Sequence, residues 1–245
     1  AHASVLLGDL GMDLAAETHG RAAAMMLEEA GASQALAMYA LAKTARWQHD
    51  YAVAADLARQ GLERGPIDPA SVQLACYEAN SAALLGDRHR ARDALARSDG
   101  MAEALTTTGQ AGSPWSFPAE RQAIFRLSVL LRTGDSGGAL AAAQAADDGW
   151  RSGDPPIPGT WAQVRIGAAL AHLRQDALDG ATEQAAQVLT LAPEFRIATV
   201  TGWLADLDRQ LARRRFASAP AAVSLRQDIR EFQAGALPAG AKEAG

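Results

Sequence analysis

Apolar residues recur along the chain at helical spacing, in paired segments joined by short polar turns. Three turns end in an aspartate that a small residue follows four places later: Gln48-His49-Asp50 before Ala54, Leu85-Gly86-Asp87 before Ala91, and Thr133-Gly134-Asp135 before Ala139. Two weaker copies are Ala15-Ala16 before Gly20 and Asp176-Ala177 before Ala181. Antiparallel helices joined by a short turn approach closely only where a side chain is nearly absent. The pattern therefore predicts a series of helical hairpins.

The spacing of the small residues indicates which kind of hairpin array to expect. Gly20, Ala54, Ala91, Ala139 and Ala181 are 34, 37, 48 and 42 residues apart. A period of about 34 residues is that of tetratricopeptide repeats, in which each repeat is one helix-turn-helix unit. We therefore expect an all-α fold, namely a tetratricopeptide-like α-solenoid of about six antiparallel helical hairpins.

Prolines and glycines mark the joints of this array, and all ten prolines fall in joints, at helix starts or in the tail. Leu6, Leu7, Leu10 and Leu14 predict the apolar stripe of a first helix that ends at about Leu14. Asp68-Pro69, an N-cap followed by a proline, is a specific helix start. The expected hairpins cover about residues 4–30, 33–64, 68–105, 119–152, 160–191 and 195–233, within a single repeat domain at 1–233.

Two segments lie outside the predicted hairpins. Residues 108–118 form an inserted loop, because two prolines and two glycines exclude regular structure there. We expect Trp115 and Phe117 to hold this loop against the body of the protein, as a lid or as a fixed plug. Residues 234–245 are small and polar, which predicts a flexible tail.

Composition limits the classes of protein to which the chain can belong. The chain is 49% hydrophobic, mostly through alanine, and its net charge of −5 argues against direct nucleic-acid binding by the chain as a whole. Cys76 is the single cysteine, so no internal disulfide can form, and a reducing cytosol is favoured. No apolar run approaches the roughly 18 residues of a membrane helix. With neither a signal-like segment nor an initiator methionine, we expect a fragment of a longer cytoplasmic protein.

Several patterns that resemble catalytic chemistry have a simpler interpretation. Gly134-Asp135-Ser136-Gly137-Gly138 matches the stretch around the nucleophile of chymotrypsin-like proteases, but that chemistry needs a histidine base on a β fold. We interpret it as a helix turn. The five histidines show no metal-ligand spacing, and Cys76 reads as a buried or groove-lining thiol. We expect no enzyme, no cofactor and no metal.

A tetratricopeptide array would present the first helix of each pair toward a concave groove. In this register the groove-facing residues include Leu36, Cys76, Ala83, Leu84, Ser128 and Gln163. The groove positions that we name as candidates for binding a ligand or peptide are Tyr39, Lys43, Arg46, Trp47, Gln73, Asn80, Arg121, Arg132 and Arg174. Arginines and a lysine beside aromatic platforms suit a peptide carboxylate or a small anionic effector. The alternative is that these arginines pair with neighbouring carboxylates or extend into water.

The C-terminal half carries a family resemblance. The residues that carry it are Asp179-Gly180-Ala181, Val188-Leu189, Leu191, Pro193-Glu194, Arg196-Ile197-Ala198-Thr199-Val200, Leu204, Leu207, Arg215-Phe216-Ala217-Ser218, Pro220, Leu225-Arg226, Ile229 and Phe232. Together with Glu28-Glu29-Ala30-Gly31 and Ser113-Pro114-Trp115-Ser116-Phe117, they resemble the tetratricopeptide-repeat region of actinobacterial regulators with an N-terminal helix-turn-helix of the xenobiotic-response-element type.

The resemblance implies an effector- or peptide-binding regulatory domain of a transcriptional regulator, although the DNA-binding helix-turn-helix is absent from this chain. The alternative is a protein–protein scaffold or dimerisation module without a small ligand, with another protein or a second copy of the chain as the partner. Its candidate contact residues are Ile197, Val200, Trp203, Leu204 and Leu207, which would more simply cap the core.

Overall fold

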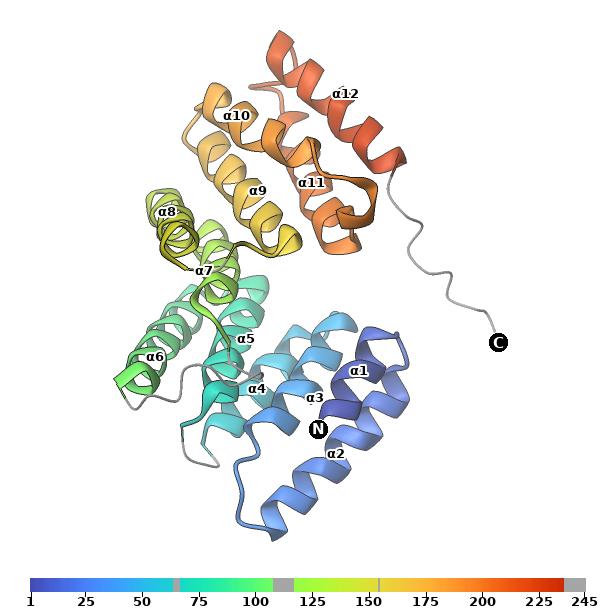
Figure 1. Ribbon diagram of the computed structural model, residues 1–245, viewed down its shortest axis with the longest axis vertical. Coiled ribbons are helices and arrows are strands. Elements are labelled where there is room, and N and C mark those ends of the chain that lie inside the picture. The colour runs from blue at the N-terminus through green and yellow to red at the C-terminus, as the bar shows by residue number, and fades with distance from the viewer. Residues whose placement is uncertain (64–66, 108–116, 154, 236–245) are drawn as a thin grey trace. The chain divides into compact units, whose positions relative to one another are not determined.

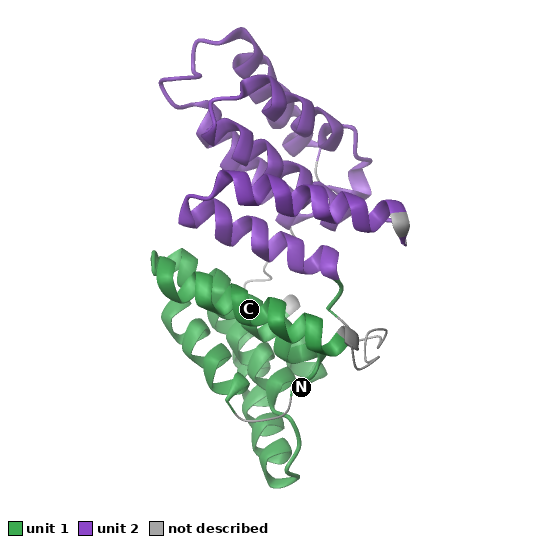
Figure 2. Ribbon diagram, turned by 90° about the vertical axis from the view of Figure 1, so that its left-hand side faces the viewer, with its two compact units in different colours: residues 1–118 green, residues 119–245 purple. Residues whose placement is uncertain are grey.

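The computed structural model describes residues 1–63, 67–107, 117–153 and 155–235. All regular structure within these ranges is helical, which confirms the predicted all-α class (Figure 1). The chain divides into two compact units, residues 1–118 and residues 119–245 (Figure 2). The single repeat domain predicted over residues 1–233 stays a prediction.

The described residues of unit 1 form six helices in three antiparallel hairpins: α1 (His2–Asp9), α2 (Asp13–Glu29), α3 (Ala35–Trp47), α4 (Tyr51–Leu62), α5 (Pro69–Leu85) and α6 (Arg88–Thr107). Each helix packs against the next one along the chain, and the leading helices of the hairpins also touch, α1 against α3 and α3 against α5. Helices α3 and α5 are buried over most of their length, so they form the centre of the unit.

Unit 2 continues the same plan with α7 (Ala119–Thr133), α8 (Ser136–Ser152), α9 (Pro158–Arg174), α10 (Leu178–Leu189), a short 3-10 turn (Pro193–Phe195), α11 (Ala198–Leu211) and α12 (Pro220–Ala234). The leading helix α9 packs against both α7 and α11, and α12 packs against α10 and α11. Two clusters of buried apolar side chains form its core, and Leu170 packs against both of them.

One backbone motif ends the leading helix of five hairpins. A residue in the left-handed region closes each helix, with φ of 75°, 64°, 85°, 90° and 60° at Gly11, His49, Gly86, Gly134 and Asp176. The next amide donates to the carbonyl five residues earlier, over 2.8 to 3.0 Å, which is a Schellman turn. Five residues after each turn residue stands an alanine that is 0% exposed, namely Ala16, Ala54, Ala91, Ala139 and Ala181. The repeated turn-plus-small-residue pattern is therefore a property of the fold.

The first hairpin departs from the sequence-based expectation. Helix α1 ends at Asp9 rather than at Leu14, because Gly11 takes the left-handed conformation and the Met12 amide closes the turn on the Leu7 carbonyl, 2.9 Å away. Its small residue is therefore Ala16, and Gly20 lies one helical turn further on. The predicted stripe is also wrong, since Leu6, Leu10 and Leu14 are 64%, 74% and 80% exposed.

The start of α5 forms as the sequence predicts. The Asp68 carboxylate accepts from the Ser71 amide over 2.8 Å, and the Ser71 hydroxyl accepts from the Asp68 amide over 3.1 Å, which together make a capping box. Pro69 occupies the first helical position.

Replacing Asp68 by alanine is expected to destabilise unit 1 by about 1 kcal/mol, because the Ser71 amide and the Ser71 hydroxyl both lose the Asp68 carboxylate as acceptor. Urea unfolding monitored by circular dichroism measures the change. Asp13→Ala is the matched control, since Asp13 opens α2 without capping it. Equal losses in the two variants would contradict a capping role for Asp68.

A buried carboxylate links three helices of unit 1. Glu78 of α5 is 0% exposed and accepts from Arg90 Nε over 2.9 Å and from Arg97 Nη2 over 2.6 Å, both on α6. Arg59 of α4 approaches the same carboxylate at 3.6 Å. Arg90 also bonds Asp56 over 2.8 Å. Burial alone would lower the pKa of Arg90, but its bonds to Asp56 and Glu78 outweigh burial and raise it.

Candidate functional site

Five side chains on the facing sides of α3 and α5 form the most distinctive polar group of unit 1. We call them the Arg46 cluster: Tyr39, Lys43 and Arg46 on α3, with Tyr77 and Asn80 on α5. Arg46 Nε donates to Asn80 Oδ1 over 3.0 Å, and the Arg46 guanidinium lies 5.7 Å from the centre of the Tyr77 ring. The Tyr77 ring meets Tyr39 edge to face, with 5.0 Å between ring centres.

Helical spacing explains why these residues share one place. Tyr39, Lys43 and Arg46 follow one another at intervals of four and three residues, so they lie on one face of α3. Tyr77 and Asn80 are three residues apart on α5, which packs against α3. Four members of the cluster are buried, and Arg46 is half-buried at its edge. The packing of the two helices therefore positions the guanidinium.

The state of Arg46 determines what the cluster can do chemically. A guanidinium has five N–H donors, and Arg46 uses Nε for Asn80. Within the described part of the chain, Arg46 forms no ion pair and its terminal nitrogens donate no hydrogen bond. Asn80 and Tyr77 hold the guanidinium in one orientation, and its terminal edge is the part that matches a carboxylate or phosphate.

Two further predicted groove residues in unit 1 lie apart from these contacts. Trp47 is 49% exposed at the end of α3, and Gln73 is half-buried on α5. Cys76 is fully buried. The sequence reasoning missed Tyr77 because its register placed Cys76 in the groove. The three-residue spacing between Tyr77 and Asn80 was the available signal, since it puts both side chains on one helical face.

The predicted cations of unit 2 are only partly brought together. Arg132 ends α7 and Arg174 ends α9, where Arg174 Nη1 donates to the carbonyl of Leu131. Arg121 begins α7, eleven residues before Arg132 and hence about 16 Å away along the helix. The structure therefore brings Arg174 to the end of α7 that carries Arg132 and leaves Arg121 at the opposite end of that helix.

The two aromatic residues proposed for the loop have different outcomes. Phe117 is 6% exposed, so its ring is buried. Trp115 lies outside the described residues, as do residues 64–66, 108–114, 116, 154 and 236–245. The proposed lid therefore stays a prediction.

The protease-like stretch functions as a helix turn. Gly134 takes the left-handed conformation, and Asp135 Oδ1 caps α8 by accepting from the Gly138 amide over 2.7 Å. Among the described residues, no three histidine, cysteine, aspartate or glutamate side chains are grouped as metal ligands would be. Nor does any described helix combine the length and apolar character required to cross a membrane.

Comparison with known proteins gives no independent indication of function. The sequence matches no protein-family model, and no curated protein matches it.

Proposed function

We propose that the chain is an effector- or peptide-binding regulatory repeat domain of a cytoplasmic transcriptional regulator, built as a tetratricopeptide-like solenoid. The five turns of one type, each followed by a buried alanine, support the repeat architecture. The bond between Arg46 and Asn80 also joins residues 34 apart, the length of one such repeat. The resemblance of residues 178–232 to actinobacterial regulators supports the regulatory role.

The observation that carries the proposal is the unpaired guanidinium of Arg46. A half-buried cation gives up part of its hydration, and proteins normally offset this with a carboxylate partner. Arg46 has Asn80 and the Tyr77 ring instead, and neither carries a negative charge. An anionic ligand would supply the missing charge and accept two parallel N–H bonds from the terminal nitrogens.

Lys43 and the two tyrosines fit the same ligand. Lys43 is one turn before Arg46 on α3, so a second cation lies close to the anionic group. Tyr39 and Tyr77 provide aromatic surface beside the two cations. The ligand class is therefore a carboxylate-bearing peptide or a small anionic metabolite.

Ligand binding at this cluster would act on the packing of α3 against α5. The ligand would bind Arg46 on α3 while Asn80 and Tyr77 on α5 hold the same guanidinium. It would therefore favour the arrangement in which both helices contribute. Regulation requires a second arrangement with lower ligand affinity, and the ligand shifts the balance by the difference between the two affinities.

Thermal unfolding of the chain against a library of peptides and small anionic metabolites tests the proposal. We expect a few compounds to raise the melting temperature in a saturable way. Arg46→Gln should weaken their binding by about ten-fold or more, since a hydrogen bond to a charged group contributes about 1.5–3 kcal/mol.

Arg21→Gln is the matched control for Arg46→Gln. Arg21 lies on α2 of the same unit, is exposed, and pairs with Glu17 four residues away over 2.6 Å. This variant should keep the full response to each compound. A response that Arg46→Gln leaves intact would place the ligand elsewhere, and the absence of any responding compound would argue against an effector.

The alternative function, a self-association module, is favoured by a different observation from the one the sequence suggested. Val200, Leu204 and Leu207 of α11 are 0% exposed, so they fill the core of unit 2. Ile197, also named as a contact residue, is 47% exposed. A group of exposed apolar side chains lies on the first hairpin, namely Leu6, Leu10, Met12, Leu14, Met25 and Met26. A sedimentation coefficient that rises with protein concentration would support this alternative, provided that Leu10→Ser abolishes the rise.

A further inference from the structure

Four arginines gather at one end of unit 2, where the leading helices stop. We call them the unit 2 arginine cluster: Arg132 at the end of α7, Arg174 at the end of α9, and Arg213 and Arg215 after α11. All four residues reach solvent, and Arg174 is partly covered. The cluster belongs to a different unit from Arg46 and is independent of the function proposed above.

Two equivalent hydrogen bonds assemble the cluster. Arg174 Nη1 donates to the Leu131 carbonyl, and Arg215 Nη2 donates to the Leu173 carbonyl over 2.8 Å. Leu131 and Leu173 each lie three residues before the left-handed residue of their own turn. Each arginine thus reaches back to the same position of the preceding hairpin, which sets Arg132, Arg174 and Arg215 in a row.

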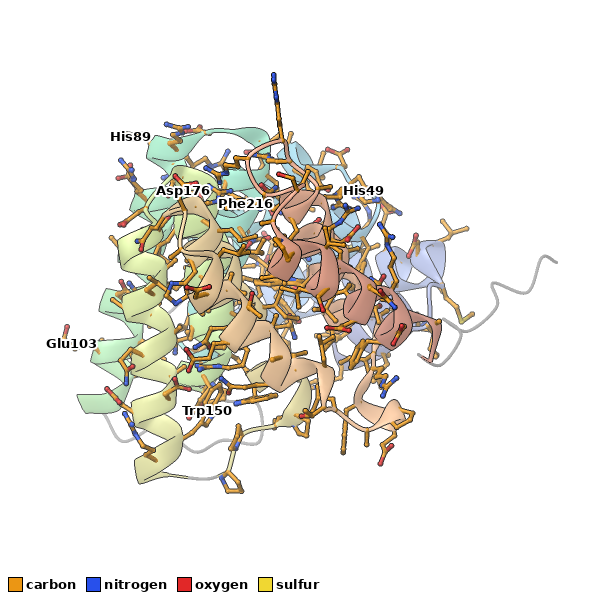
Figure 3. The ribbon with its side chains drawn as sticks, turned by 90° about the horizontal axis from the view of Figure 1, so that it is seen from above. His49, His89, Glu103, Trp150, Asp176 and Phe216 are labelled. Carbon is orange, nitrogen blue, oxygen red and sulfur yellow. The ribbon has the colours of Figure 1, made fainter. Side chains whose placement is uncertain are left out.

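The arginines at this end differ in whether they have a carboxylate partner. Arg215 Nη1 pairs with Asp176 over 2.8 Å, and Figure 3 labels Asp176 together with Phe216, whose ring lies 4.6 Å from the Arg215 guanidinium. Within the described part of unit 2, the side chains of Arg174 and Arg213 have no ion pair. Partial burial, and next the charges of Arg213, Arg132 and Arg215, lower the pKa of Arg174.

Helix capping explains only part of this arrangement. The C-terminal end of a helix attracts cations, and one arginine on each of two carbonyls satisfies that preference. Arg213 donates no side-chain hydrogen bond within the described residues, yet it contributes to the field at Arg174. Capping therefore accounts for Arg174 and Arg215 but leaves the additional cation unexplained.

We propose that the unit 2 arginine cluster binds a phosphate-class oxyanion, either inorganic phosphate or the phosphate group of a small metabolite. Arg174 and Arg215 each use one N–H group for a backbone carbonyl and keep others for an anion. A dianionic phosphate balances more positive charge than a single carboxylate does. The planar fork of arginine also matches phosphate oxygens in pairs.

The test is thermal unfolding of the full chain in increasing sodium phosphate, compared with sodium chloride at equal ionic strength. A second series uses glycerol phosphate, which separates a preference for the free anion from a preference for the ester. We expect a saturable rise in melting temperature with at least one phosphate compound and none with chloride.

Arg213→Gln should weaken the response about ten-fold, and Arg174→Gln should do the same. Arg213→Gln is the decisive variant, because this side chain supports no contact in the described fold and its loss leaves α9 and α11 intact. Arg151→Gln is the control, since Arg151 is an exposed residue at the far end of α8 and pairs with Asp148. The proposal would be overturned if phosphate raised the melting temperature no more than chloride does. It would also be overturned if Arg213→Gln left the rise in phosphate unchanged.

Discussion

Replacing Glu78 by glutamine is expected to destabilise unit 1 by about 3 kcal/mol or more, as the removal of one partner from a buried ion pair does. Glu78 is 0% exposed and accepts from Arg90 and Arg97. A neutral amide would leave these guanidinium groups facing one another, and its own N–H groups would oppose theirs. Urea unfolding gives the free energy of unfolding. Hydrogen exchange in α4, α5 and α6 shows where protection is lost.

The matched control for this prediction is Glu17→Gln. Glu17 forms an exposed pair with Arg21 on one turn of α2, and its loss should cost less than about 0.5 kcal/mol. A loss below 1 kcal/mol for Glu78→Gln would contradict a stabilising role. So would a loss of protection that is equally large in α9 and α10.

Enlarging the buried alanine after a turn should also have a large effect. Ala139→Leu is expected to destabilise unit 2 by about 1–3 kcal/mol, because three added carbon atoms enter a filled core. Ala139 is 0% exposed and belongs to the cluster that contains Leu127 and Leu131. Ala141→Leu, two residues later on α8, adds the same side chain at an exposed position.

The comparison of these two variants isolates packing from helix propensity, since both replace alanine by leucine in one helix. Ala141→Leu should change the free energy of unfolding by less than about 0.5 kcal/mol. Similar losses in both variants would show that close approach at Ala139 is not what the turn motif provides.

The sequence predicted the helices well where the joints carry strong local signals. The fourth hairpin was expected at 119–152, and α7 and α8 together span those bounds, because Gly134 and Asp135 have one strongly preferred role at a helix turn. The prediction of the first hairpin was wrong because the periodic spacing of leucines continues past Gly11. Local backbone preference at Gly11, rather than the apolar period, decides where α1 stops.

The candidate site was harder to predict, because it depends on how two helices face each other. Tyr39, Lys43, Arg46 and Asn80 were named from their spacing, and the structure groups them on α3 and α5. Tyr77 was missed, since an error of one residue in register exchanges it for Cys76. Residues 213 and 215 lie after a helix end, where periodicity gives no information. The bonds from Arg215 to the Leu173 carbonyl and to Asp176 show where Arg215 lies.

The most direct measurement of the central claim is heteronuclear NMR of the arginine side-chain N–H groups during titration with a compound that raises the melting temperature. If Arg46 is the anion receptor, its guanidinium signals shift in a saturable way, with the same midpoint as the thermal stabilisation. The signals of Arg21, already paired with Glu17, stay in place. A compound that stabilises the protein while the Arg46 signals remain unchanged would contradict the claim.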